Sequence, residues 1–139
     1  MDIMVCYDDS PAAKEAVQIA LTRAKTMKAA IHLVVSYSGA LYDTSSEKDA
    51  QRVWKDVEKA EDALNEIKKS FDEEKIPCSI HVSVRNLEPG EDLVTYADEN
   101  KIDEIIIGIQ KTSKVGKLLF GSTAQYVILR AKCPVLTVK

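Results

Sequence analysis

Near the end of the sequence, glycines and small hydroxyl residues occupy positions from which a phosphate group could be held. Gly108 ends an apolar run at residues 105–107, and Gly121-Ser122-Thr123 opens a second segment with helical apolar spacing. This order predicts a strand, a loop and then a helix. The first N–H groups of a helix have no partner within it, and the helix dipole is positive there. The pattern therefore predicts an anion site, for phosphate above all.

The charge distribution draws attention to the same segment. Residues 105–139 contain no Asp or Glu, whereas residues 1–104 contain 13 basic and all 22 acidic residues. The six basic residues of the segment are Lys111, Lys114, Lys117, Arg130, Lys132 and Lys139. The first three lysines fall in the predicted loop, where they could shield a polyphosphate or form an ordinary solvated surface. We select Lys111 as the candidate ligand contact among them.

Other kinds of chemistry find little support in the sequence. It has no Walker loop, because Gly116-Lys117 is followed by Leu118 instead of Ser or Thr, and it has no G-x-G-x-x-G. His32 and His81 stand in strand patterns without a partner at metal-ligand spacing, so we expect packed histidines. No Ser-His-Asp, Cys-His or paired-carboxylate arrangement can be assembled. We therefore expect neither catalytic residues nor a metal site.

The elements that would position the candidate residues alternate between strands and helices. Strands are predicted at residues 3–7, 31–37, 79–84, 102–108 and 135–138, and helices at 11–28, 47–75, 91–100 and 122–131. Ser10 before Pro11 predicts a capped helix start, and residues 38–46 are expected to form a loop. Helical connections imply right-handed crossovers. The predicted class is α/β, a doubly wound, Rossmann-like, five-stranded parallel sheet with helices on both faces.

In an open sheet of this kind, ligands bind beyond the carboxyl ends of the strands, where the strand order reverses. Residues 8–10, 35–38 and 108–122 should meet there. The long helix at residues 47–75 carries one apolar stripe on an otherwise charged segment, as expected for a helix packed on a sheet. Trp54 lies one residue off this stripe, and we expect it to pack at the periphery of the core, with partial exposure or a subunit contact as the alternative.

Length and composition limit the remaining possibilities. The 139 residues, 45% hydrophobic and 29% charged, fit a single domain over residues 1–139. Cys6, Cys78 and Cys133 are far apart, which predicts small buried residues instead of a zinc site. We expect a cytoplasmic protein, because no apolar run approaches ~20 residues and the acidic N-terminus does not resemble a secretory signal. The net charge of −3 and 6% aromatic content argue against a nucleic-acid partner.

The positions of Gly108 and Gly121-Ser122 resemble the nucleotide-binding signature of the universal stress protein family, G-x2-G-x9-G-[ST]. The resemblance covers the whole chain, through YDDS at 7–10, EPG at 88–90, IDEIIIG at 102–108 and CPVLTV at 133–138. It implies a protein that binds ATP or AMP, with or without Mg²⁺. The implied role is that of a nucleotide-responsive stress factor read by a protein partner that the sequence does not identify.

The resemblance also implies roles for single residues, in which Asp8 faces the nucleoside and Val35 contacts adenine. The implied phosphate-binding positions are Gly108, Gly121, Ser122 and Thr123. A carboxylate can accept hydrogen bonds from ribose hydroxyls, and an aliphatic side chain can cover a purine face. Asp8 could also serve only to cap its own loop.

This chain departs from the signature at its second glycine, where it has Lys111. If a glycine is needed there for a positive φ or a close approach to phosphate, lysine costs about 1–3 kcal/mol. If the loop adapts, the ammonium group offers a contact of about 1.5–3 kcal/mol. The alternative to ATP binding is therefore a nucleotide-free interaction module.

In both interpretations we expect a homodimer through the last strand, Val135–Val138. A short apolar strand at the end of the sheet leaves unpaired backbone groups, and the resemblance implies two-fold pairing of this strand between subunits. Catalysis of ATP hydrolysis would need a water-positioning group and a carboxylate for the metal ion. Since residues 105–139 supply no acid, we expect slow hydrolysis at most.

Overall fold

The structure is a computed structural model that describes residues 1–38, 46–109 and 120–139. Its elements follow in the order β1 (Asp2–Cys6), α1 (Pro11–Met27), β2 (Ala30–Ser38), α2 (Glu47–Glu73), β3 (Cys78–Arg85), α3 (Pro89–Glu99), β4 (Glu104–Gly108), α4 (Ser122–Arg130) and β5 (Val135–Val138). The strands pair in parallel in the order β3-β2-β1-β4-β5. The order reverses between β1 and β4. The predicted fold class is confirmed.

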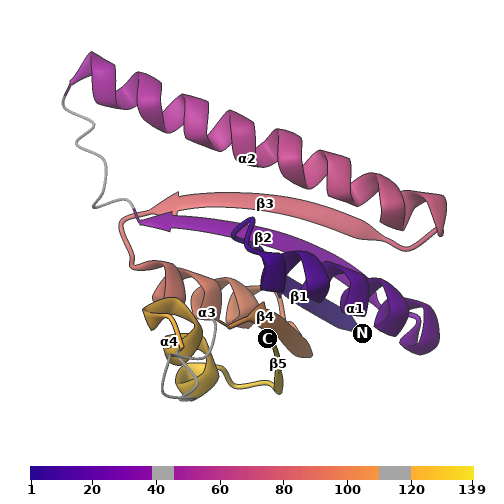
Figure 1. Ribbon diagram of the computed structural model, residues 1–139. Helices are drawn as coiled ribbons and strands as arrows, with labels where there is room; N and C mark the ends of the chain where they lie inside the picture. Colours follow the sequence, from indigo (N-terminus) through magenta and orange to yellow (C-terminus); the bar gives the residue numbers. More distant parts are fainter. Residues whose placement is uncertain (39–45, 110–119) are drawn as a thin grey trace.

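Two apolar cores lie on opposite faces of the sheet, each covered by two helices (Figure 1). α1 and α2 pack on the face to which Ile3 and Val5 of β1 point. α3 and α4 cover the other face, where Met4 and Cys6 point. Because successive side chains of a strand alternate between faces, the hydrophobic strand β1 contributes to both cores.

Helix starts follow local residue chemistry. The Ser10 hydroxyl oxygen accepts a hydrogen bond from Ala13 N at 3.1 Å, which confirms the predicted cap of α1. α3 begins at Pro89, two residues earlier than predicted, because proline suits the first helical position. Gly90 next to it lets α4 approach, since a Cβ there would lie 2.7 Å from Tyr126 Cβ. The Pro-Gly pair that predicts a break therefore begins α3 and packs it against α4.

The long helix α2 buries the predicted apolar stripe, including Ala60, Leu64 and Phe71. Trp54 is 73% exposed, so the expectation of peripheral packing is wrong. One residue corresponds to a rotation of about 100° around a helix, enough to turn a side chain next to the stripe away from the sheet.

The two histidines pack against Tyr96, as predicted. His32 Nδ1 lies 2.9 Å from the Tyr96 hydroxyl, and His32 Nε2 lies 2.9 Å from Asp2 Oδ1. The His81 ring stacks on Tyr96 with a centroid distance of 4.8 Å. Within residues 1–38, 46–109 and 120–139, no group of three or more His, Cys, Asp or Glu could hold a metal ion.

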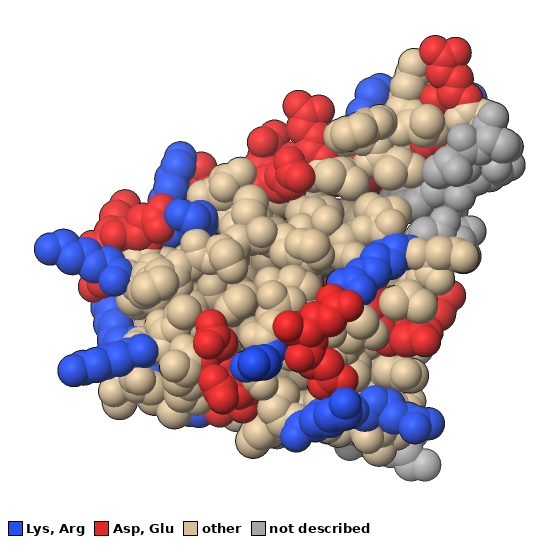
Figure 2. Space-filling view, turned by 180° about the vertical axis from the view of Figure 1, so that it is seen from behind, with Lys and Arg blue, Asp and Glu red and all other residues tan. Residues whose placement is uncertain are grey.

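The charge asymmetry of the sequence is reduced in space at Lys132, a basic residue of the last segment that lies beside an acidic one. Lys132 after α4 pairs with Asp98 of α3 at 3.0 Å. Figure 2 shows Lys and Arg side chains interspersed with Asp and Glu on one face of the molecule. Among the helices in the described part of the chain, none is both long and apolar enough to cross a membrane.

Candidate functional site

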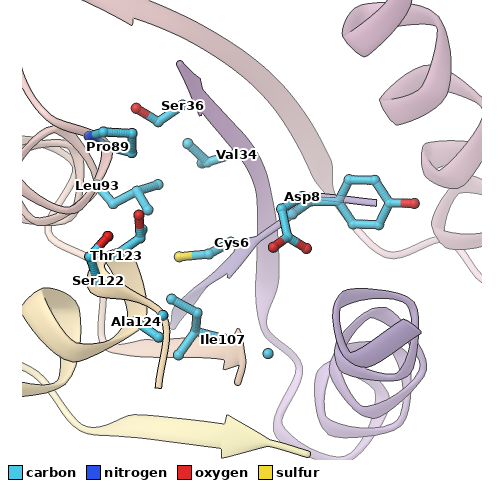
Figure 3. Close-up of a pocket in the computed structure, with 13 residues that line it drawn as sticks. Cys6, Asp8, Val34, Ser36, Pro89, Leu93, Ile107, Ser122, Thr123 and Ala124 are labelled. Atoms are coloured by element: carbon cyan, nitrogen blue, oxygen red, sulfur yellow. The ribbon is translucent and has the colours of Figure 1, made fainter. Parts of the chain in front are cut away.

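A cavity of about 230 Å³ lies at the carboxyl ends of β1, β2 and β4, where the strand order reverses (Figure 3). Its apolar lining comes from five elements, with Cys6 on β1, Val34 on β2, Leu93 on α3, Ile107 on β4 and Ala124 on α4. Burial first, then the nearby carboxylate of Asp8, raises the pKa of the Cys6 thiol far above its usual range. The thiol therefore stays protonated and contributes apolar surface, not a nucleophile.

The start of α4 forms one polar side of this cavity. Gly121 is the N-cap residue, and Ser122 and Thr123 are the first two residues of the helix. No side chain of the described residues caps these N–H groups, and the first turn holds no acid. Free donors, two hydroxyl groups and the positive end of the helix dipole thus meet at one cavity, which suits an anion.

Gly108 lines the cavity at the end of β4, beneath the start of α1. A Cβ at this position would lie 2.8 Å from Ala12 Cβ and 2.9 Å from Ala13 N. Distances this short leave no room for a side chain. The glycine is therefore required by the packing of α1 on β4, in addition to any role toward a ligand.

Asp8 is exposed at the end of β1 and lines the cavity. Its Oδ1 atom accepts a hydrogen bond from Ser10 N at 3.1 Å, a contact that supports the turn into α1. The neighbouring Asp9 has a φ of 63° and accepts a hydrogen bond from the Tyr7 hydroxyl at 3.0 Å. Asp8 therefore has a local structural role, and it also presents a carboxylate to the cavity.

Val35, the expected adenine contact, does not line this cavity. Val35 belongs to the core under α1 and α2, on the opposite face of β2 from Val34. It lines a second cavity of about 350 Å³ beneath α2, which shares Tyr7, Asp8 and Ser36 with the first. The alternation of side chains along the strand brings Val34 and Ser36 to the first cavity instead.

The candidate residues from distant parts of the chain thus converge at one place. The first cavity brings together Asp8, Gly108, Gly121, Ser122 and Thr123, whose backbones belong to β1, β4 and α4 or to the turns beside them. Sequence reasoning missed Val34, Ser36 and Leu93 at this site. Lys111 and the two other loop lysines, Lys114 and Lys117, lie outside the described residues.

A sequence model of the universal stress protein family matches residues 1–139. The chain belongs to the universal stress protein family. It is 34% identical over 82 residues to a universal stress protein of Methanocaldococcus jannaschii. This match spans 59% of the present chain and 47% of the relative, which is about half of the relative's length.

Two solved structures extend the comparison of this universal stress protein to the full chain. A universal stress protein from Archaeoglobus fulgidus is 32% identical with a TM-score of 0.75, covering 100% of this chain and 98% of that one. A universal stress protein structure from the same organism, in complex with dAMP, is 29% identical with a TM-score of 0.71 and the same coverage. The family and the fold of the chain are therefore established together.

Proposed function

We propose that this universal stress protein binds an adenine nucleotide, ATP or AMP, at the cavity where β1, β4 and α4 meet. The convergence of uncapped N–H groups, two hydroxyl groups and an apolar lining carries this proposal. The start of α4 with Ser122 and Thr123 would hold phosphate. Asp8 would accept hydrogen bonds from ribose hydroxyls, and Val34 and Leu93 would cover the apolar part of the nucleoside. The related structure in complex with dAMP supports this assignment.

We further propose that nucleotide binding serves regulation in the cytoplasm and not efficient catalysis. Asp8 lines the same cavity as Ser122 and Thr123, and Asp9 follows it and lines the neighbouring cavity, so these two carboxylates are the candidate contacts for Mg²⁺. Asp8 is engaged with Ser10 N, and Asp9 with Tyr7. Hydrolysis would need a further group to position water, so we expect slow turnover at most. The bound state would be read by a protein partner.

Lys111 supports the competing function, a nucleotide-free interaction module, because it stands where the family signature has glycine. Calorimetric titration of nucleotide-stripped protein with ATP and Mg²⁺ separates the two, with Lys111→Gly measured in parallel. We expect the unmodified protein to bind ATP. Binding that appears only after Lys111→Gly would contradict the proposal and favour the interaction module.

A matched pair of threonine variants tests where the phosphates bind. Thr123→Val removes a hydroxyl group from the cavity, and Thr137→Val makes the same change on β5, away from the cavity lining. We expect Thr123→Val to weaken ATP binding roughly five- to tenfold, the loss of about one hydrogen bond. Thr137→Val should leave the affinity unchanged. Equal affinities of the two variants would argue against phosphate binding at α4.

A further inference from the structure

An ion-pair network with the buried carboxylate of Asp92 at its centre reaches the cavity from α3. Asp92, in the first turn of α3, is 1% exposed. Its Oδ2 atom accepts a hydrogen bond from the hydroxyl group of Ser36, which lines the cavity. Its Oδ1 atom lies 2.9 Å from Arg85 Nε, as an ion pair without the alignment of a hydrogen bond. Arg85 in turn donates to both carboxylate oxygens of Glu99, at 3.3 and 3.1 Å.

Stability alone does not account for this arrangement. Removing the Asp92 carboxylate from water is costly, and its attraction to Arg85, whose side chain is 33% exposed, often no more than offsets this cost. The position of Asp92 near the positive end of the α3 dipole offsets part of the cost of removing its carboxylate from water. Ser36 is the member of the network that lines the cavity, so the network can also act on a ligand through this hydroxyl group.

The network fixes the direction of the Ser36 hydrogen bond. A carboxylate paired with a guanidinium group accepts hydrogen bonds and cannot donate them. The Ser36 hydroxyl group must therefore donate its only proton to Asp92. Its oxygen retains lone pairs that can still accept. Ser36 thus presents an acceptor, and no donor, to a group that enters beside Val34 and Pro89 (Figure 3).

We propose that Ser36 selects nucleotides whose nucleoside donates a hydrogen bond to it, and that Asp92 and Arg85 are positioning residues that set this direction. The inference rests on the proposed function and adds the basis of its specificity. Two donors of an adenine nucleotide could meet Ser36, the exocyclic amino group of the base and the 2′-hydroxyl group of the ribose. Hypoxanthine has a carbonyl oxygen in place of that amino group, so two acceptors would face each other.

Three nucleotides distinguish the two donors, namely ATP, ITP and dATP, each titrated by calorimetry. If the amino group meets Ser36, the unmodified protein should bind ATP roughly tenfold more tightly than ITP. If the 2′-hydroxyl group meets Ser36, the affinity for ATP should exceed the affinity for dATP by a similar factor. The affinities for ATP and ITP should then be equal. In either case Ser36→Ala should bring the relevant ratio close to one.

Ser83→Ala is the matched control for Ser36→Ala. Ser83 lies opposite Ser36 in the β2–β3 register and is buried, but it is not among the described residues that line the cavity. The same hydroxyl group is removed from the neighbouring strand, so any general effect on the sheet should appear in both variants. Only Ser36→Ala should change the nucleotide ratio.

Asp92→Asn tests the direction of the hydrogen bond itself. The Arg85 guanidinium group would attract the amide oxygen, which leaves the amide NH₂ group to donate to Ser36. The Ser36 proton would then be free to point into the cavity. A carbonyl acceptor would become the better partner, so the ATP-to-ITP ratio should fall below one if the base meets Ser36. Circular dichroism and the melting temperature establish that the variant is folded.

The outcomes separate this inference from the proposed function. If the unmodified protein binds none of the three nucleotides, the proposed function fails and the inference fails with it. If ATP binds but the ATP-to-ITP and ATP-to-dATP affinity ratios are both close to one in the unmodified protein, only the inference is overturned. The same holds if a ratio above one is unchanged in Ser36→Ala. A changed ratio in Ser36→Ala together with an unchanged ratio in Ser83→Ala supports it.

Discussion

Gly108 ends β4 where the first turn of α1 fills the space that a side chain would need. Because a Cβ would lie 2.8 Å from Ala12 Cβ, Gly108→Ala must displace α1. We expect a loss of about 1–3 kcal/mol in the free energy of unfolding, measured by urea denaturation. Gly121→Ala is the comparison, since its φ of −65° suits alanine and only about 0.5–1 kcal/mol should be lost, because alanine is a poorer N-cap residue than glycine. Equal losses would contradict the packing argument.

Tyr7 makes the stability sensitive to alkaline pH. Burial first, and then the hydrogen bond to Asp9, raise the pKa of Tyr7 from 10.0 to about 12. Between pH 10 and 12 the folded protein keeps a proton that the unfolded chain has lost, so stability falls as pH rises through this range. In urea titrations, the advantage of the unmodified protein over Tyr7→Phe should be complete below pH 10 and shrink toward pH 12. Tyr126→Phe, on an exposed ring, serves as the comparison.

The candidate site could be predicted at Asp8 and at the start of α4, because spacing and residue type mark these positions. Val34 could not be distinguished from Val35, since residues 33–35 are all apolar and the strand is covered on both faces. A pattern without alternation does not say which side chain points to which face. The burial of Asp92 could not be predicted either, because an acidic residue in the first turn of a helix is common on a protein surface. Its partners Arg85 and Ser36 belong to β3 and β2 and not to its own helix.

The long helix α2 gives a direct test at the scale of elements. Leu64 is fully buried against the sheet, whereas Trp54 on the same helix is 73% exposed. Leu64→Ala should lower the free energy of unfolding by about 2–5 kcal/mol, and Trp54→Ala should change it by less than about 0.5 kcal/mol. Circular dichroism in urea measures both. A larger effect of Trp54→Ala would mean that its side chain is packed against something.

Elements were predicted well because their signals are local, and their ends less well because contacts between elements set them. All nine predicted strands and helices are present. β4 begins at Glu104 instead of Ile102, since Ile102 N donates to Ala97 O at 2.9 Å and closes the end of α3. α3 begins at Pro89 because Gly90 fits against α4. Neither contact can be derived from the residues of one element.

At the scale of the whole molecule, β5 is the last strand of the sheet order, which supports the predicted homodimer. Pro134 O and Val138 O accept hydrogen bonds from β4 and from Ile109 just after it, so the intervening Val135 and Thr137 direct their N–H groups outward. If two copies pair through β5, Thr137→Pro should remove a bond at the interface without disturbing the ladder to β4. Sedimentation equilibrium should then show a dimer for the unmodified protein and a shift toward monomer for the variant.

Thr137→Val is the control for that experiment, because it retains the backbone donor and should remain dimeric. Leu129 on α4, 71% exposed, adds apolar surface near the end of the chain that a second copy could cover. A monomeric unmodified protein, or a Thr137→Pro variant that is as dimeric as the control, would contradict pairing through β5.

The strand order affects how the protein can fold while it is being synthesised on the ribosome. β1 is the central strand, but its neighbour β4 lies about a hundred residues later in the chain. While residues 1–103 are being translated, one edge of β1 has no partner and the apolar residues Met4 and Cys6 lack half of their core. Such an unfinished sheet exposes a surface on which nascent chains aggregate or recruit chaperones. Because β4 and α4 also complete the cavity, the proposed nucleotide would not stabilise the chain at this stage.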